Sequence, residues 1–230
     1  SLMVIAPAMY AKLPYDTQRD FAPVSLLGSA AYVLVVHPSV PARSARELIT
    51  LARARPDKLT YASAGSGASS HLAGELFKMM ADVKIVHVPY RASPLATLSV
   101  VAGESDLMFS NILPAVPAIR GNRLRPLGIT SAKRSSVLAD VPTIEESGLP
   151  GYEVVQLYGL LAPAGTPRDI VRRLNEETVK AVQSAEMRDR LRAEGSEVAV
   201  STPEELEKII ALELRKWAKV IKQAGITEAP

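Results

Sequence analysis

The stretch that decides the fold spans residues 61–77 and reads YASAGSGASSHLAGELF. Its beginning is typical of a strand, its middle is a loop of small residues, and its end repeats apolar side chains at helical spacing. Backbone N–H groups at a helix start lack intrahelical acceptors, and the helix dipole is positive there. Gly65 and Gly67 allow a tight turn and a close backbone approach, and nearby serines add hydroxyl groups. The stretch therefore predicts a site for a phosphate or a carboxylate.

Other interpretations of this stretch are weaker. The dinucleotide fingerprint fails because Ser70 occupies its third glycine position, and the Walker pattern fails because no Gly-Lys-Ser/Thr follows. Residues 64–68 imitate the nucleophile elbow of a hydrolase around Ser66, but that fold needs a histidine far downstream. Only His71 and His87 follow, on the adjoining helix and the next predicted strand. A helix cap without any ligand stays open as an alternative.

Strands and helices are predicted to alternate around this stretch. The strand-like runs cover 32–36, 59–63, 83–88, 106–109 and 124–130, and the helix-like runs begin at 44, 69, 94 and 114. Ser44, with Glu47 three positions later, predicts a capping box, and Pro56 ends that helix. The alternation is typical of an α/β fold.

The last third of the chain repeats one capping device. A threonine is followed three residues later by an acidic residue at Thr143 and Glu146, Thr166 and Asp169, and Thr202 and Glu205. Each pair predicts a helix start, and in the last two a proline stands at the first helical position. A strand is expected over 152–162, and a final amphipathic helix is expected to end at Gly225.

Composition excludes several classes of function. The 230 residues include 27 Lys and Arg against 24 Asp and Glu, a net charge of +3, and only 5% aromatic residues, too little for nucleic-acid binding. Cysteine is absent, which removes thiolate catalysis and cysteine-based metal sites. The three histidines have no metal-binding spacing, so no metal or cofactor is predicted. No apolar run approaches the roughly 18–20 residues of a membrane-spanning helix, and no secretion-signal pattern opens the chain.

Eight short motifs in a fixed order carry a resemblance to a known family. They are DFAPV at 20–24, YASAGSGASSHLAGELF at 61–77, HVPYR at 87–91, DLMF at 106–109, LRPL at 124–127, DVPT at 140–143, GLLAPAGTP at 159–167 and KW at 216–217. Together they cover nearly the whole chain. The sequence resembles the tripartite tricarboxylate transporter receptors, the Bug family of extracytoplasmic solute-binding proteins.

The resemblance implies an α/β, two-lobed periplasmic-binding-protein fold of type II. We expect a first lobe from 1–88 plus 201–230 and a second lobe from 89–200. The implied function is capture of a small carboxylate in the periplasm and its delivery to a membrane permease, with no enzymatic activity. An effector-sensing domain of the same fold, which would signal to a partner, remains the alternative. Family members begin several tens of residues earlier, so we expect the first lobe to be incomplete in this sequence.

The resemblance also implies contact residues for the carboxylate. They are Ser66, Gly67, Ala68 and Ser69 in the first loop, Tyr90, Ala92 and Ser93 before the next helix, and Asn111 after DLMF. For Tyr90 and Asn111, a packing ring and a turn former stay open as alternatives. Ala68 stands where the family usually has Ser or Thr, and Arg91 to Ser93 replace its usual Lys-Gly pair.

Overall fold

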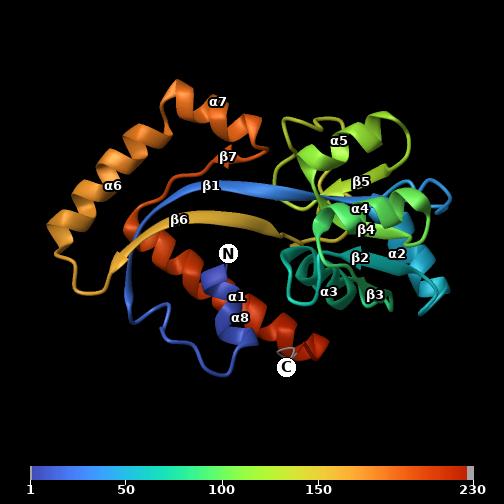
Figure 1. Ribbon diagram of the computed structural model, residues 1–230, viewed down its shortest axis with the longest axis horizontal. Coiled ribbons are helices and arrows are strands. Elements are labelled where there is room, and N and C mark those ends of the chain that lie inside the picture. Colours follow the sequence, from blue (N-terminus) through green and yellow to red (C-terminus); the bar gives the residue numbers. More distant parts are fainter. Residues whose placement is uncertain (1, 227–230) are drawn as a thin grey trace. The chain divides into compact units, whose positions relative to one another are not determined.

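The computed structural model describes residues 2–226, which form an α/β fold of eight helices and seven strands (Figure 1). The strands are β1 (Phe21–Val36), β2 (Thr60–Ser63), β3 (Val86–Pro89), β4 (Leu107–Asn111), β5 (Arg125–Ile129), β6 (Val155–Pro163) and β7 (Glu197–Val198). The helices are α1 (Leu2–Met9), α2 (Ala45–Ala54), α3 (Ser69–Ala81), α4 (Ser93–Ala102), α5 (Ile112–Arg120), α6 (Arg168–Val182), α7 (Ala185–Ala193) and α8 (Pro203–Ala224). Within residues 2–226, none of these helices has both the length and the apolar character of a membrane span.

The chain forms two compact units. Unit 1 comprises the chain up to Ala30 and from Gln156 onward, and unit 2 comprises Ala31–Val155. Inside unit 2, β2 pairs with both β3 and β4, so residues on either side of position 88 share one sheet. The expected lobe boundary at 88–89 therefore does not coincide with a boundary between compact units. The assignment of 1–88 plus 201–230 and 89–200 to ligand-closing lobes stays a prediction.

The sheet of unit 2 has the strand order β3-β2-β4-β1-β5. β2 is parallel to β3 and to β4, whereas the end of β1 is antiparallel to β4 and β5. The register sets Tyr61 opposite His87 and Ser63 opposite Pro89. The three parallel strands therefore run side by side, as expected for βαβ units.

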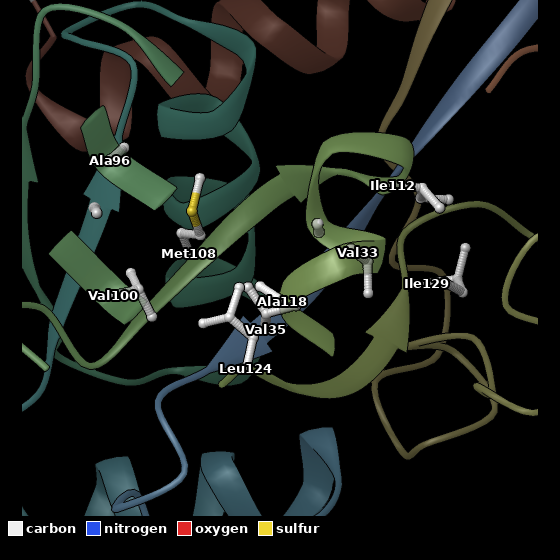
Figure 2. Close-up of a cluster of buried hydrophobic side chains, with 11 residues drawn as sticks. Val33, Val35, Ala96, Val100, Met108, Ile112, Ala118, Leu124 and Ile129 are labelled. Carbon is white, nitrogen blue, oxygen red and sulfur yellow. The ribbon is translucent and has the colours of Figure 1, made fainter. Parts of the chain in front are cut away.

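Helices cover both faces of this sheet because successive strand side chains point to opposite sides. On one face, Val33, Val35 and Met108 pack with apolar residues of α4 and α5 (Figure 2). On the other face, Phe77 of α3 lies with its ring centroid 5.8 Å from that of Phe109. Since strands between two helical layers are buried on both sides, they read as continuous apolar runs, as Tyr32 to Val36 do.

Unit 1 contains the beginning of β1, β6, β7 and the helices α1, α6, α7 and α8. α1 packs on α8, whose Trp217 is 3% exposed. The Asn175 amide of α6 donates hydrogen bonds to the carbonyl oxygens of Val24 and Ser201, both at 2.8 Å. The Leu26 N–H donates to the Ser201 hydroxyl at 3.0 Å. These bonds join β1, α6 and the residue preceding the cap of α8.

Two of the predicted helix caps are confirmed. The Ser44 side chain accepts from the Glu47 N–H at the start of α2, although the Glu47 carboxylate reaches Arg43 rather than Ser44. Thr202 and Glu205 form a complete capping box before α8. Gly225 ends this helix with φ 64°, as expected of a left-handed C-cap.

The other two threonines do not cap a helix, although α6 does begin at Arg168, one residue after the expected first helical position. Thr143 and Glu146 do exchange both bonds, at 2.8 and 3.0 Å, but they close a turn and no helix follows. α6 has Pro167 as its N-cap, and the Thr166 hydroxyl donates instead to the Pro163 carbonyl at 2.7 Å. The Thr166 hydroxyl thus serves the preceding turn, which competes with the helix for it, whereas Thr143 accepts from the Glu146 N–H in a turn that does not continue as a helix.

Gly74 lets α3 lie directly on the ring of Tyr61, and this gives a first prediction. A Cβ at Gly74 would overlap three carbons of that ring, which is 1% exposed and cannot move aside. Alanine is favoured over glycine in a helix by about 1 kcal/mol, but overpacking costs about 1–3 kcal/mol. Gly74→Ala should therefore lower the free energy of unfolding by about 1 kcal/mol in urea denaturation.

Gly159→Ala is the matched control. Its added Cβ would lie 3.6 Å from the Ser25 carbonyl oxygen, an ordinary contact, so we expect little change. A stabilised Gly74→Ala protein would show that the Tyr61 ring can shift and would contradict the prediction.

Candidate anion-binding site at three helix N-termini

Three helices of unit 2 begin directly after the parallel strands. β2 leads into α3 through residues 64–68, β3 leads into α4 through residues 90–92, and β4 joins α5 at Asn111 (Figure 1). Because β3, β2 and β4 are parallel neighbours, their carboxyl ends meet at one edge of the sheet. This edge is where open α/β sheets usually bind ligands.

None of these three helix starts is capped by its own side chain. The N-cap residues Ala68, Ala92 and Asn111 make no side-chain cap hydrogen bond. Helices α2, α7 and α8 are capped by side chains, those of Ser44, Ser184 and Thr202. A missing cap ordinarily lowers helix stability by about 1 kcal/mol. α6, whose N-cap is Pro167, lacks a side-chain cap as well, but α3, α4 and α5 are the uncapped helices whose N-termini share the sheet edge.

The charges of the first helical turns differ in the same way. α2, α6, α7 and α8 each carry an acidic residue in the first turn, which complements the positive end of the helix dipole. α3, α4 and α5 carry none, and neither does α1. At the sheet edge, three helix dipoles are therefore left without a negative charge from the first turn of the same helix.

Free backbone donors accompany these dipoles. In α3 the first hydrogen bond of helical spacing runs from the Leu72 N–H to the Ala68 carbonyl at 3.0 Å. The N–H groups of residues 69–71 come before this bond and therefore have no acceptor of that spacing within the helix. In α4 the corresponding bond runs from Ala96 to Ala92 at 3.2 Å. Such N–H groups form a ready site for an anion.

The loop between β2 and α3 is shaped by two glycines with positive φ. Gly65 has φ 117° and Gly67 has φ 77°, conformations that L side chains rarely adopt. A Cβ on Gly65 would lie 3.4 Å from the Tyr90 carbonyl oxygen, and the Tyr90 N–H donates to the Ser63 carbonyl at 2.9 Å. The loops before α3 and α4 are therefore in direct contact.

The contact residues predicted from the sequence all lie at these helix starts. Ser66, Gly67, Ala68 and Ser69 are at α3, Tyr90, Ala92 and Ser93 are at α4, and Asn111 is at α5. Ser66, Ala92 and Asn111 are exposed, and the others are half-buried. The fold thus gathers them at one edge of the sheet of unit 2, and their contact with a ligand stays a prediction.

Two of these residues have other partners in the structure. The Tyr90 ring packs against the apolar cluster under α4, and its hydroxyl lies 3.4 Å from that of Ser105. This geometry favours the packing role for Tyr90. Gly67, a predicted contact residue, donates its N–H to Nδ1 of His71 at 2.9 Å.

Sequence reasoning missed a buried polar cluster beneath the loop. The rings of Tyr61, His71 and His87 stack, with 3.9 Å between the two imidazole centroids. The Tyr61 hydroxyl donates to Glu75 at 2.5 Å, and the Lys78 ammonium donates to the same oxygen at 2.7 Å. The sequence feature that could have revealed this cluster is the two-residue periodicity of β2, which places Tyr61 and Ser63 on the face of the sheet that α3 covers.

Burial dominates the protonation of this cluster. Loss of solvation, followed by the neighbouring His87, lowers the pKa of His71 to about 4. Burial also lowers the pKa of His87 and raises that of Tyr61. Both imidazoles are therefore neutral near pH 7.

The arrangement offers neither a metal site nor an accessible nucleophile. Within residues 2–226, no group of three His, Asp or Glu side chains could hold a metal ion. His87 pairs with the hydroxyl of Ser63 at 2.6 Å and not with Ser66. Ser63 has no exposed surface, so a substrate could not reach its oxygen. The site is suited to holding an anion with main-chain donors.

A family model decides the classification. The chain matches the family described as "Tripartite tricarboxylate transporter family receptor" over residues 1–226. The chain belongs to this receptor family. Because the family consists of receptors, membership agrees with the expectation that the chain is not an enzyme.

Curated relatives of this receptor family are similar along almost the whole chain. A "UPF0065 protein in tcbD-tcbE intergenic region" from Pseudomonas sp. (strain P51) is 40% identical over 220 residues, covering 95% of this chain and 66% of the relative. "Protein BugT" from Bordetella pertussis is 30% identical over 223 residues, covering 97% of this chain and 68% of the relative. The chain therefore spans about two thirds of the length of these relatives.

Solved structures of similar proteins include two with dicarboxylates. "R. palustris Rpa4515 with adipate" is 34% identical with a TM-score of 0.79, covering 99% of this chain and 76% of that one. MatC from Rhodopseudomonas palustris "with bound malate" is 32% identical with a TM-score of 0.73, covering 95% and 76%. A TctC solute-binding protein from Polaromonas, 22% identical with a TM-score of 0.84, shares the fold and covers 96% of this chain and 75% of that one.

The lowered pKa of His71 predicts a pH dependence of stability. The folded state resists protonation down to about pH 4, whereas an unfolded chain takes up this proton near pH 6.5. Stability should therefore be full above pH 6.5, fall as the pH decreases toward 4, and level off below that. The stability lost is on the order of a few kcal/mol, because a difference of one pKa unit between the folded and unfolded states corresponds to about 1.4 kcal/mol.

Chemical denaturation between about pH 7.5 and pH 4 measures this dependence. His71→Asn lacks the titrating group, so its stability should fall less over the same interval. Equal pH slopes for the two proteins would rule out His71 as the origin.

Proposed function

We propose that this chain captures a small carboxylate, of the dicarboxylate class, at the N-termini of α3, α4 and α5. The observation that carries the proposal is that these three neighbouring helix starts lack both a side-chain cap and a first-turn acidic residue. A carboxylate would complement the free N–H groups and the helix dipoles together. Adipate and malate, found in two similar proteins, support a dicarboxylate rather than a phosphate.

The contacts we propose follow the loops at the sheet edge. One carboxylate group accepts from the N–H groups at the start of α3, with the hydroxyls of Ser66 and Ser69 beside it. Ala92 and Ser93 border the same loop from α4, and the Asn111 amide, free of any cap bond, faces the ligand from α5. Tyr90 supports this edge by packing.

The family supports a place for this binding step. Its description as a receptor of tripartite tricarboxylate transporters leads us to propose that the captured carboxylate is passed to a membrane permease. We further propose that this takes place in the periplasm, a location supported by the similar structure of the "periplasmic binding protein BugD", which is 28% identical with a TM-score of 0.76.

Ligand binding should stabilise the folded chain. A ligand present at 100 times its dissociation constant adds about 2.7 kcal/mol to the free energy of unfolding. Adipate, malate and a series of other aliphatic dicarboxylates are compared by thermal shift, with the uncharged diamides as controls. The absence of any stabilising carboxylate would contradict the proposed function.

Ala68→Asp should separate stability from binding. Ala68 already has N-cap geometry, with φ −62° and ψ 153°, so an aspartate there can cap α3 with its own carboxylate. We expect the free energy of unfolding to rise by about 1 kcal/mol and the dicarboxylate affinity to fall by about tenfold or more.

Calorimetric titration with adipate and urea denaturation measure the two effects. Ser44→Ala is the matched control, because it removes the cap of α2 and should lower stability by about 1 kcal/mol without affecting binding. A stabilised Ala68→Asp protein with unchanged affinity would exclude the α3 N-terminus as the anion site.

A further inference from the structure

The loop before α3 rests on two imidazole rings. His71 and His87 stack with 3.9 Å between their centroids and an interplanar angle of 10°, and the Tyr61 ring stacks on His87 at 4.8 Å. His71 is 5% exposed. The three rings belong to β2, β3 and α3, so they connect the strands to the helix whose N-terminus is uncapped.

His71 is hydrogen-bonded to the loop directly, and His87 is connected to it through the hydroxyl of Ser63. Nδ1 of His71 accepts from the Gly67 N–H at 2.9 Å. Nε2 of His87 lies 2.6 Å from the Ser63 hydroxyl, and this hydroxyl accepts from the Gly65 N–H at 3.1 Å. Both loop glycines with positive φ therefore donate their N–H groups to this cluster, Gly67 to His71 and Gly65 to Ser63.

The bond to Gly67 fixes the protonation of His71. An N–H donor requires a bare acceptor, so Nδ1 carries no proton and the neutral ring carries its proton on Nε2. Nε2 lies 3.8 Å from the Glu75 carboxylate, which is already bonded to the Tyr61 hydroxyl and the Lys78 ammonium.

The groups around His71 give its charged form little support. From α3 it is faced by Glu75 and Lys78, whose charges oppose one another, from β3 by His87, and from β2 by Tyr61. Burial and His87 are the two largest causes of its lowered pKa. The ring therefore remains an acceptor throughout the neutral pH range.

We propose that His71 is a positioning residue for the anion site: as a neutral acceptor for the Gly67 N–H, it holds the Gly-Ser loop in the conformation that binds a carboxylate. The inference rests on the proposed function and adds that the protonation state of His71 regulates the binding loop. Protonation at Nδ1 would place the N–H of His71 opposite the N–H of Gly67. Because two donors cannot form a hydrogen bond, Gly67 would be released. The conformation of the loop therefore does not change with pH in the neutral range, and the loop opens only under strong acidification.

Two substitutions separate the acceptor from the ring. In His71→Asn the amide oxygen can occupy the place of Nδ1 and accept from Gly67, whereas His71→Leu fills the space without an acceptor. With adipate as the probe at about pH 7.5, calorimetry should show an affinity within about threefold of the parent for Asn and at least about tenfold lower for Leu. Equal loss in both variants, or in neither, while both remain folded by circular dichroism, would overturn the proposal.

The pH profile of binding gives a second test. Adipate itself titrates, so the quantity compared is the ratio of parent to His71→Asn affinity at each pH. This ratio should stay constant from about pH 8 to pH 5.5 and fall near the pKa of His71, about 4. A ratio that changes around pH 6.5, or that rises on acidification, would contradict a buried neutral acceptor.

A measurement without ligand distinguishes this inference from the proposed function. In nitrogen-15 NMR spectra of the free protein, His71 should show an unprotonated Nδ1, and the Gly67 amide should shift with the same acidic midpoint as the ring. His71→Leu should move the Gly65 and Gly67 amide signals more than His71→Asn does. If these hold and no carboxylate binds the parent protein, the proposed function fails alone; a protonated Nδ1 near pH 7 refutes the role of His71.

Discussion

The parallel pairing of β2 with both β3 and β4 is the constraint on which the rest of unit 2 depends. Parallel strands require a crossover between them, and here each crossover contains a helix that starts at the carboxyl end of its strand. The pairing therefore aligns three helix N-termini, and no contact among the helices is needed for this alignment. It also sets the register that brings His87 opposite Tyr61, and with it the stacked rings below the loop. The alignment of the helix N-termini and the stacking of the rings are both consequences of the same hydrogen-bonded ladder.

Helix stability and the proposed binding of an anion make opposite demands at this sheet edge. Elsewhere in the chain Ser44, Ser184 and Thr202 cap their helices with a side chain, and α6, which has no such cap, carries Asp169 in its first turn. Ala68 and Ala92 have the backbone geometry of a cap but no polar atom to fill it. Donors that remain unpaired in the free protein can pair with a ligand instead. Function at the expense of local stability is common at binding sites.

Local sequence signals were sufficient for much of the fold. The small residues around Gly65 and Gly67 predicted the turn into α3, and a Thr-Pro-x-Glu pattern predicted the start of α8, because both depend on residues within one turn of each other. The α/β class followed from the alternation of such segments. The candidate site could be placed at the loop for the same reason: an unpaired helix start is encoded in a few consecutive residues.

What depends on distant partners could not be predicted in this way. Residues 21–31 of β1 include a proline and a glycine and show no clean alternation, because their pairing comes from β6 and β7 far along the chain. The polar helix α7 has no buried residue that would produce an apolar period. The contact between His71 and His87 requires the β2–β3 register, and the failure of Thr166 as a cap reflects a competing turn at Pro163.

The main-chain recognition proposed for this site has a consequence for how such a receptor could change its ligand. The donors at the start of α3 belong to the backbone, so no single side-chain replacement at Ser66, Ser69 or Ala92 removes them. Those side chains are free to alter the size and polarity of the space around the anion while the anion itself stays held. Gain of affinity for a new carboxylate can therefore proceed by single substitutions that leave the common carboxylate group bound throughout. One scaffold of this kind can diversify across many acids without passing through a form that binds none.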